Sequence, residues 1–310
     1  MENQLLGLHH ITAIAGNAQR NFNFYTKTLG LRFLKKTVNF DDPGTYHLYY
    51  GDERGSAGTI LTFFPWENMQ PGRRGPGQAT EIGYAVPVGS LDFWMKRFDS
   101  QGVTYNKPAE KFGERYLTFL DPDGLKLELT EVADDPRTPW TTTEVSAGVA
   151  TRGFHHITLT LNDVQATAAV LTEVFGYKLV AQHVNRFRYA TDALGTANLV
   201  ELVAVPGEGR GHVAAGSVHH VAFRVKDDAS QLYFRELLLK KGFQVTPQID
   251  RQYFHAMYFR EPGGVLFEVA TDTPGFMVDE PLAELGTHLM LPPQHEGKRA
   301  AIEAHLPVLA

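Results

Sequence analysis

The sequence predicts an α+β fold in which four βαβββ modules pair to form two half-closed barrels of mixed sheet. Two observations lead to this prediction. Strand-like segments with alternating apolar residues and helix-like segments recur in the same order along the 310 residues. The near-constant period is 73, 73 and 64 residues, measured between the equivalent positions His10, Gly83, His156 and His220. Because the sheet of one module has a single apolar face, each module must pair with another.

The first module contains every element of the repeat. Alternating apolar residues predict a strand at 8–16, and helical spacing predicts a helix at 18–31. Three further strand-like runs follow at 32–40, 46–51 and 58–64.

The other three modules repeat the order of first strand, helix and closing strands. Modules two and four end alike, in DPDGLKLEL and EPGGVLFEV, where an acid-Pro-x-Gly turn precedes an apolar strand. The predicted segments are 81–87, 90–102 and 115–131 in module two, 154–161, 164–176 and 197–205 in module three, and 218–225, 230–242 and 253–270 in module four.

The length and two changes in composition suggest two domains. We predict an N-terminal domain of modules one and two at 5–132 and a C-terminal domain of modules three and four at 153–272. An acidic stretch rich in Pro and Thr, 133–152, is the predicted linker. The tail at 273–310 is irregular, with one short amphipathic helix expected near 296–305.

The composition excludes several classes of function. The formal net charge of −6 offers no basic field for a nucleic acid. The absence of cysteine excludes disulfides, thiolate nucleophiles and iron–sulfur clusters, so any metal must be held by nitrogen and oxygen. The chain has neither a signal-like N-terminus nor a long apolar run, so we expect a cytoplasmic protein that does not enter a membrane.

Six of the 13 histidines form three adjacent pairs at the starts of modules one, three and four. The pairs lie in GLHHITAI (7–14), GFHHITLT (153–160) and SVHHVAFR (217–224). Side chains alternate along a strand, so one histidine of each pair faces the cup formed by two modules and the other faces away. The pattern alone leaves open which of the two faces inward.

The first and last strands of each module supply the candidate metal ligands. Two histidines and one carboxylate are typical of non-haem Fe(II) oxygenases, whereas a second carboxylate would suit zinc, nickel or magnesium. Glu268 lies between apolar residues, and burying it without a cation would be costly. The candidates are His10 with Thr62 or Phe63 in module one, Gly83 or Tyr84 with Glu128 in module two, His156 with Glu201 in module three, and His220 with Glu268 in module four.

The chain resembles the vicinal oxygen chelate superfamily, which includes glyoxalase I, extradiol dioxygenases and the fosfomycin and bleomycin resistance proteins. More narrowly, it is similar to the Mhq-type ring-cleaving dioxygenases, relatives of the Fe(II)-dependent hydroquinone 1,2-dioxygenases. The resemblance spans about residues 5–305. It rests on LHHITAI, VNFDDPGTYHLYYG, GTILTFFPW, FGERY, VHHVAFR, YFREPGGVLFEVATD and GTHLMLPPQHE.

The resemblance implies that modules one and four hold the metal, on His10, His220 and Glu268. The second histidine of each pair is then the inward one. The ion implied is Fe(II) or Mn(II), and another divalent ion can take its place in a crystal. The supporting positions implied around the metal are His9, Thr12, His219, Arg251 and Tyr258.

The histidine pair of module three departs from the family pattern. If modules three and four formed the cup, as in catechol extradiol enzymes, the ligands would be His156, His220 and Glu268, with Glu201 nearby. The shared motifs follow the hydroquinone branch and favour the pairing of modules one and four.

The function implied is ring cleavage of a hydroquinone-type or catechol-type aromatic with O2, so the expected partners are a small aromatic substrate and oxygen. The sequence leaves open whether the chain forms a homo-oligomer. One alternative is a glyoxalase-type isomerase or lyase that uses Ni, Co or Zn and Glu201 or another carboxylate as base. The other is a non-catalytic quinone-binding or antibiotic-binding protein, for which a missing ligand carboxylate would be the signature.

Overall fold

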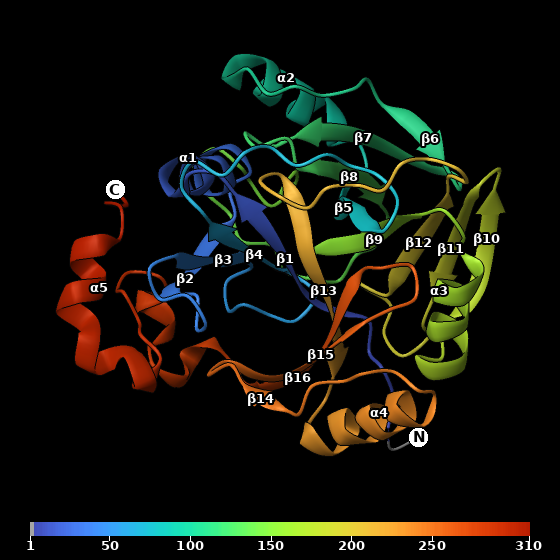
Figure 1. Cartoon of the computed structure of the whole chain (residues 1–310). Coiled ribbons are helices and arrows are strands. Elements are labelled where there is room, and N and C mark those ends of the chain that lie inside the picture. The colour runs from blue at the N-terminus through green and yellow to red at the C-terminus, as the bar shows by residue number, and fades with distance from the viewer. Residues whose placement is uncertain (1–2) are drawn as a thin grey trace.

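A computed structural model describes residues 3–310, and its architecture is two eight-stranded mixed sheets with helices around them (Figure 1). The first sheet has the order β14-β15-β16-β13-β1-β4-β3-β2. Its strands are β1 (Leu8–Ala15), β2 (Arg32–Val38), β3 (Tyr46–Gly51), β4 (Ile60–Pro65), β13 (Ser217–Val225), β14 (Ile249–Asp250), β15 (Phe254–Arg260) and β16 (Leu266–Pro274).

The second sheet repeats this arrangement, in the order β10-β11-β12-β9-β5-β8-β7-β6. Its strands are β5 (Gln78–Pro87), β6 (Ala109–Lys111), β7 (Glu114–Leu120), β8 (Lys126–Val132), β9 (Phe154–Leu161), β10 (Lys178–His183), β11 (Arg186–Ala190) and β12 (Leu199–Ala204). The predicted α+β class and the two half-closed sheets are confirmed.

Each sheet is joined at its centre by the first strands of two modules. Strand β1 pairs antiparallel with β13, which joins module one to module four, and β5 pairs antiparallel with β9, which joins module two to module three. Within each module the first strand runs parallel to the last, as β1 does with β4. Each sheet therefore takes strands from both sides of the predicted linker 133–152. The division into domains at 5–132 and 153–272 stays a prediction.

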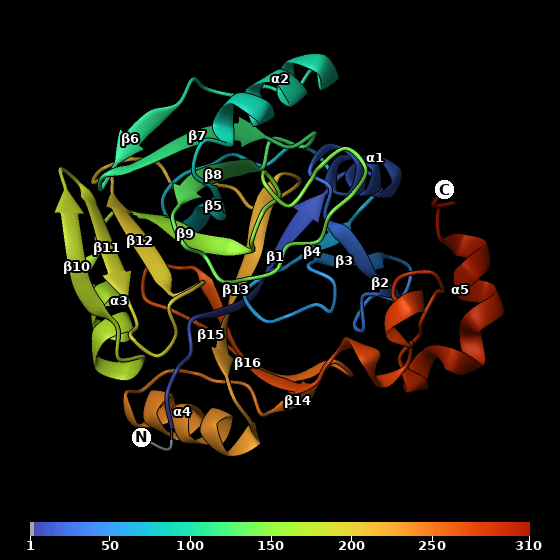
Figure 2. The same ribbon diagram turned by 180° about the vertical axis from the view of Figure 1, so that it is seen from behind.

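The module helices lie on the outside of the sheets, and the view from behind shows the same arrangement (Figure 2). In modules one and three the helix ends in a π-helical turn, and the tail contains three short 3₁₀ turns before its last helix. No helix in the described part of the chain is long and apolar enough to cross a lipid bilayer. The helices are α1 (Ala18–Asn23) with η1 (Phe24–Thr28), α2 (Leu91–Gln101), α3 (Gln165–Ala169) with η2 (Val170–Val174), α4 (Asp228–Lys240), η3 (Phe276–Val278), η4 (Leu282–Glu284), η5 (Pro293–Lys298) and α5 (Arg299–His305).

Four strands are absent from the sequence prediction: β6, β10, β11 and β14. Two of them, β6 and β14, have three and two residues, which is too short to show an alternating pattern. Strand β10 lies at a sheet edge and exposes the adjacent residues Leu179 and Val180, so its apolar residues do not alternate either.

The C-terminal tail lies beside β2, at the edge of the first sheet (Figure 1). Lys35 of β2 is fully buried, and its Nζ lies 2.6 Å from Oδ1 of Asp279 and 2.5 Å from Oε2 of Glu280. Nε2 of His295 lies 2.9 Å from the carbonyl oxygen of Phe40, in the loop that follows β2. The tail therefore supports the strands and loop of module one. Helix α5 falls within the predicted 296–305.

Candidate metal centre

The register of three neighbouring strands brings His10, His220 and Glu268 together. On β1 and β13, Thr12 lies opposite His220, and on β13 and β16, Ala222 lies opposite Glu268. The three side chains are buried, and one ligand atom of each lies within 4.8 Å of the others. With Thr62 of β4, which lies opposite Thr12, they form what we call the first cup.

Glu268 is a carboxylate whose hydrogen-bonding capacity is not met by the protein. It is fully buried, and within the described residues no N–H or O–H is well aligned to donate to either of its oxygens. Nε2 of His220 lies 2.9 Å and Nε2 of His10 lies 3.4 Å from Oε2 of Glu268. An uncompensated buried carboxylate is costly, and a cation between these three side chains would remove that cost.

The protonation states of the cup suit a divalent ion. Burial lowers the pKa of His220 and outweighs the opposing effect of Glu268, so the imidazole is neutral near pH 7. Burial acts to raise the pKa of Glu268, but His10 and His220 hold it well below its usual range, so the carboxylate is ionised. Neutral imidazole and ionised carboxylate are the forms that coordinate a metal.

The first histidine of each pair is hydrogen-bonded to the second. The Nδ1 atoms of His9 and His10 lie 2.9 Å apart, and those of His219 and His220 lie 2.8 Å apart. When the second histidine carries its proton on Nδ1 and donates it in a hydrogen bond to Nδ1 of the first, its Nε2 has a free lone pair for a cation held between it and Glu268. The pair is therefore a ligand with a neighbour that fixes its tautomer.

Thr12 belongs to a chain of hydrogen bonds beside the cup. Its Oγ1 lies 2.7 Å from Oγ1 of Thr62, which lies 2.9 Å from Nε2 of His47. Nδ1 of His47 lies 2.8 Å from the hydroxyl of Tyr49. The sequence prediction missed His47 and Tyr49, although their place two residues apart on one strand could have indicated a shared face.

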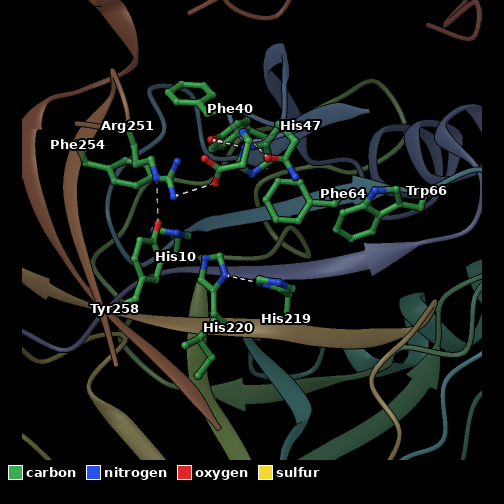
Figure 3. A pocket seen from close by; sticks show the side chains of 14 residues that line it. His10, Phe40, His47, Phe64, Trp66, His219, His220, Arg251, Phe254 and Tyr258 are labelled. Carbon is green, nitrogen blue, oxygen red and sulfur yellow. Dashed lines mark hydrogen bonds and ion pairs between the residues drawn. The ribbon is translucent and has the colours of Figure 1, made fainter. Parts of the chain in front are cut away.

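A cavity of about 330 Å³ opens onto the cup (Figure 3). Its walls are mainly aromatic, and its polar groups are contributed by both modules of the sheet. Phe64 and Trp66 stand on one side of the histidines, and Tyr258 and Arg251 on another (Figure 3). The lining residues are His10, Asn39, Phe40, Asp41, His47, Tyr49, Phe64, Trp66, His219, His220, Arg251, Phe254, Tyr258 and Leu266.

Arg251 and Tyr258 form a hydrogen-bonded pair in this cavity. Nε of Arg251 donates to the Tyr258 hydroxyl at 3.3 Å, and Nη2 of Arg251 donates to Asp41 at the same distance. Burial, and to a lesser extent Glu268, raises the pKa of Tyr258 far above its usual value, so the phenol keeps its proton. Asp41 is in the loop after β2, so this contact links modules one and four across the cavity.

The alternative ligands His156 and Glu201 lie in the second sheet, on β9 and β12. The structure therefore does not bring them together with His220 and Glu268. They lie beside Glu128, which is buried and paired with Lys111. Lys111 was not among the residues predicted from the sequence.

Comparison with known proteins identifies the family of the chain. The family described as "Glyoxalase/Bleomycin resistance protein/Dioxygenase superfamily" matches residues 7–129 and 153–269. A Bacillus subtilis (strain 168) protein named "Putative ring-cleaving dioxygenase MhqO" is 46% identical over 99% of this chain and 97% of its own.

Two further relatives match over nearly the whole length. A chlorohydroquinone/hydroquinone 1,2-dioxygenase of Sphingobium indicum is 37% identical over 94% of this chain and 92% of its own. The crystal structure of a protein from Bacillus subtilis subsp. subtilis str. 168, described as a "putative dioxygenase", superposes with a TM-score of 0.95 at 45% identity. It covers 99% of this chain and 98% of its own. The chain therefore belongs to the glyoxalase/bleomycin resistance protein/dioxygenase superfamily, and the two named relatives that match it over nearly their full length carry dioxygenase names.

Proposed function

We propose that this protein is a ring-cleaving dioxygenase that holds Fe(II), or Mn(II), on His10, His220 and Glu268 and opens a hydroquinone-type ring with O2. The observation that carries the proposal is Glu268, a fully buried carboxylate whose close polar neighbours are two imidazole nitrogens, beside an aromatic-walled cavity. The names of the relatives support the reaction class.

The donor set fits the ion. Two imidazoles and one carboxylate leave several coordination positions free, as in non-haem Fe(II) oxygenases. The fourth position of the cup is occupied by Thr62, which is hydrogen-bonded to Thr12 and His47. When bound, the metal would supply a Lewis acid for the substrate hydroxyl and a binding place for O2.

The protein's own residues would position the substrate and manage its protons. The cavity volume suits one substituted ring, and Phe64, Trp66 and Phe254 offer apolar walls for it. Tyr258 retains its proton and is oriented by Arg251, so it can donate a hydrogen bond to an oxygen near the metal. His219 also lines the cavity. Because its Nδ1 accepts from His220, its own proton is on Nε2, from which it can donate a hydrogen bond.

The expected alternative, a glyoxalase-type isomerase or lyase, has less support in this cup. Glu201, the base considered for it, lies in the other sheet and is bonded to Lys111, Arg186 and Arg188. The further carboxylate that lines the cavity is Asp41, which is 78% exposed at its side chain and paired with Arg251. Neither is placed as a buried base beside the proposed metal.

Oxygen uptake tests the reaction class. Protein loaded with Fe(II) without oxygen is mixed with methylhydroquinone, and O2 consumption and absorbance are followed. We expect O2 consumption that depends on both iron and substrate, together with a ring-opened chromophore. If folded, iron-loaded protein consumes no O2 with any of several hydroquinones and catechols, the assignment as a ring-cleaving dioxygenase is wrong. Isomerisation of a thiohemiacetal without O2 would support the glyoxalase alternative instead.

A further inference from the structure

The second sheet contains a cup built in the same register as the first. Glu128 lies opposite Gly83 as Glu268 lies opposite Ala222, and Glu201 lies opposite Thr158 as Thr62 lies opposite Thr12. We call the group of His156, Glu81, Glu128 and Glu201 the second cup. Their equivalents in the first cup are His10, His220, Glu268 and Thr62, in that order.

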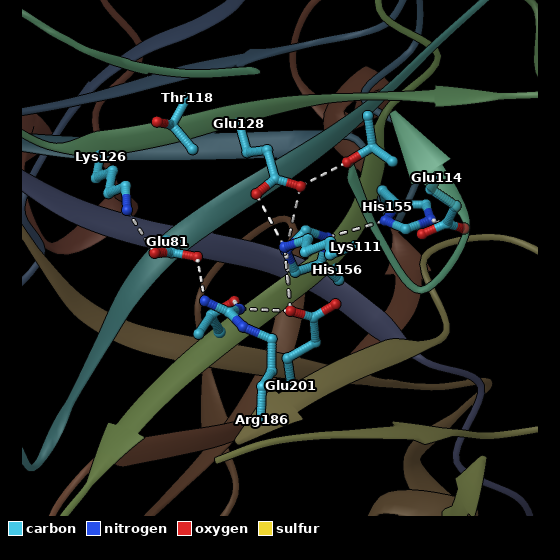
Figure 4. A network of polar contacts seen from close by, with 12 residues as sticks. Glu81, Lys111, Glu114, Thr118, Lys126, Glu128, His155, His156, Arg186 and Glu201 are labelled. Carbon is cyan, nitrogen blue, oxygen red and sulfur yellow. Dashed lines mark hydrogen bonds and ion pairs between the residues drawn. The ribbon is translucent and has the colours of Figure 1, made fainter. Parts of the chain in front are cut away.

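The ammonium of Lys111 lies at the centre of the second cup (Figure 4). Its Nζ lies 2.9 Å from Oε2 of Glu128, 3.2 Å from Oε2 of Glu201 and 3.3 Å from Nε2 of His156. An ammonium has three protons, and each is matched here by one acceptor. Lys111 is on the short edge strand β6, and the whole residue is 7% exposed.

The His155–His156 pair has the same arrangement as the two pairs of the first cup. The Nδ1 atoms of His155 and His156 lie 2.9 Å apart, and Nε2 of His155 lies 3.2 Å from Oε1 of Glu114. Lys111 can only donate, so Nε2 of His156 must be the acceptor and its proton must be on Nδ1. His156 therefore holds the tautomer that a metal ligand requires, with its lone pair directed at a cation.

The backbone is shaped to admit this ring. A Cβ added to Gly83 would lie 2.3 Å from the His156 imidazole, so only glycine leaves room for the ring at this position. The remaining charges of the cup are also paired. Arg186 and Arg188 contact Glu201, and Lys126 contacts Glu81 with its Nζ 2.6 Å from Oε1.

We propose that the Lys111 ammonium is the resident cation of a second metal cup, and that removing it uncovers a divalent-cation site on His156, Glu128 and Glu201. The ligand atoms stand farther apart than in the first cup, since Nε2 of His156 lies 3.8 Å from an oxygen of each glutamate. The contacts to Nζ exceed a metal–ligand bond of about 2.1 Å by roughly 1 Å, so the site must contract by that amount to bind an ion.

The surroundings allow this exchange. A cavity of about 170 Å³ adjoins the cup and is lined by Lys111, Glu81, Glu128 and Arg186 among others. It has room for the waters that would complete the coordination of an ion. In the native protein the ammonium thus excludes divalent ions from the second cup and confines them to the first. This inference concerns metal binding and does not depend on which reaction the first cup performs.

Metal stoichiometry tests the inference, with Co(II) as a visible probe. His10→Ala/His220→Ala removes two ligands of the first cup, so any tight Co(II) measured in that background belongs elsewhere. We expect this background to bind no tight equivalent, and the addition of Lys111→Ala to restore one, with the d–d absorption of a nitrogen and oxygen site. Adding His156→Ala as well should abolish it. Co(II) should also raise the Tm of the Lys111→Ala chain.

Lys126→Ala is the matched control, because it removes a cation from the same cup but leaves Lys111 against His156. It should gain no Co(II) and no metal-dependent rise in Tm. A folded Lys111→Ala chain that binds no more Co(II) than its background would overturn the inference, as would binding that survives His156→Ala. If Lys111→Ala does not fold, Lys111→Gln is titrated in the same way, and a folded chain without Co(II) uptake is equally decisive against it.

Discussion

The Nδ1 atoms of His9 and His10 lie 2.9 Å apart, so the one proton between them determines whether Nε2 of His10 presents a lone pair to the cup. His9→Phe keeps a ring but removes the acceptor. We expect this variant to bind Fe(II) or Co(II) roughly 10–100-fold more weakly, as found when the outer partner of a metal-bound histidine is lost. His155→Phe makes the same change in the second cup and should leave affinity at the first cup unaltered. Equal affinity of His9→Phe and the native chain in a metal titration would contradict the role given to the pair.

The stability of the metal-free protein should fall as the pH falls below about 6.5. Burial lowers the pKa of His219 to about 3, below the usual histidine value of 6.5. The unfolded chain therefore binds a proton between these two pH values that the folded chain does not bind, and each such group costs about 1.4 kcal/mol of stability per pH unit within the window. Urea unfolding at pH 7 and pH 5 measures this. The free energy of unfolding of His219→Phe should depend less steeply on pH. An unchanged slope would show that His219 does not titrate as described.

Tyr258→Phe should separate turnover from metal binding. The variant keeps the ring that lies 5.7 Å from the His220 ring, but it loses the hydroxyl that Arg251 orients. If that hydroxyl donates to the substrate or to oxygen, kcat should drop by about 100-fold while metal affinity stays the same. Steady-state O2 uptake with iron quantified in the same sample checks this. Undiminished kcat would show that the hydroxyl has no part in the reaction.

Lys35→Met should destabilise the fold through the tail. The buried ammonium pairs with Asp279 and Glu280. Removing it leaves two partly or fully buried carboxylates without their cation. Loss of one partner of a buried ion pair costs about 3–5 kcal/mol in the free energy of unfolding. Lys178→Met breaks the exposed pair with Asp192 and should cost at most about 1 kcal/mol. Similar denaturant midpoints for the two variants would mean that the tail is not anchored by Lys35.

The repeat and the strand pattern were enough to predict the fold, because the period of two and the spacing of the modules are local properties of the chain. They were also enough to identify paired histidines and a buried Glu268 as candidates. Which histidine faces inward could not be decided from alternation, because a shift of one residue exchanges the two faces. In the structure Thr12 lies opposite His220, and this register directs the second histidine of each pair, His10 and His220, toward Glu268.

The pairing of modules was a property of the whole chain and could not be read from local pattern. Both pairings bury the same apolar faces, so His156 was a reasonable ligand until β9 was placed beside β5. Lys111 escaped prediction for a related reason. It lies on a strand of three residues in module two. Two of the three acceptors of its ammonium, His156 and Glu201, are contributed by module three through the pairing of β9 with β5.

Comparing His10→Ala with His156→Ala for bound iron and for O2 uptake with methylhydroquinone tests whether the metal is bound in the first cup. The two histidines occupy equivalent positions in the two cups, and each is paired with its neighbour in the same way. We expect His10→Ala to lose both iron and O2 uptake, whereas His156→Ala, once shown to be folded, should keep both. If His156→Ala loses iron and turnover while His10→Ala keeps both, the metal is in the second cup and the proposed site is wrong.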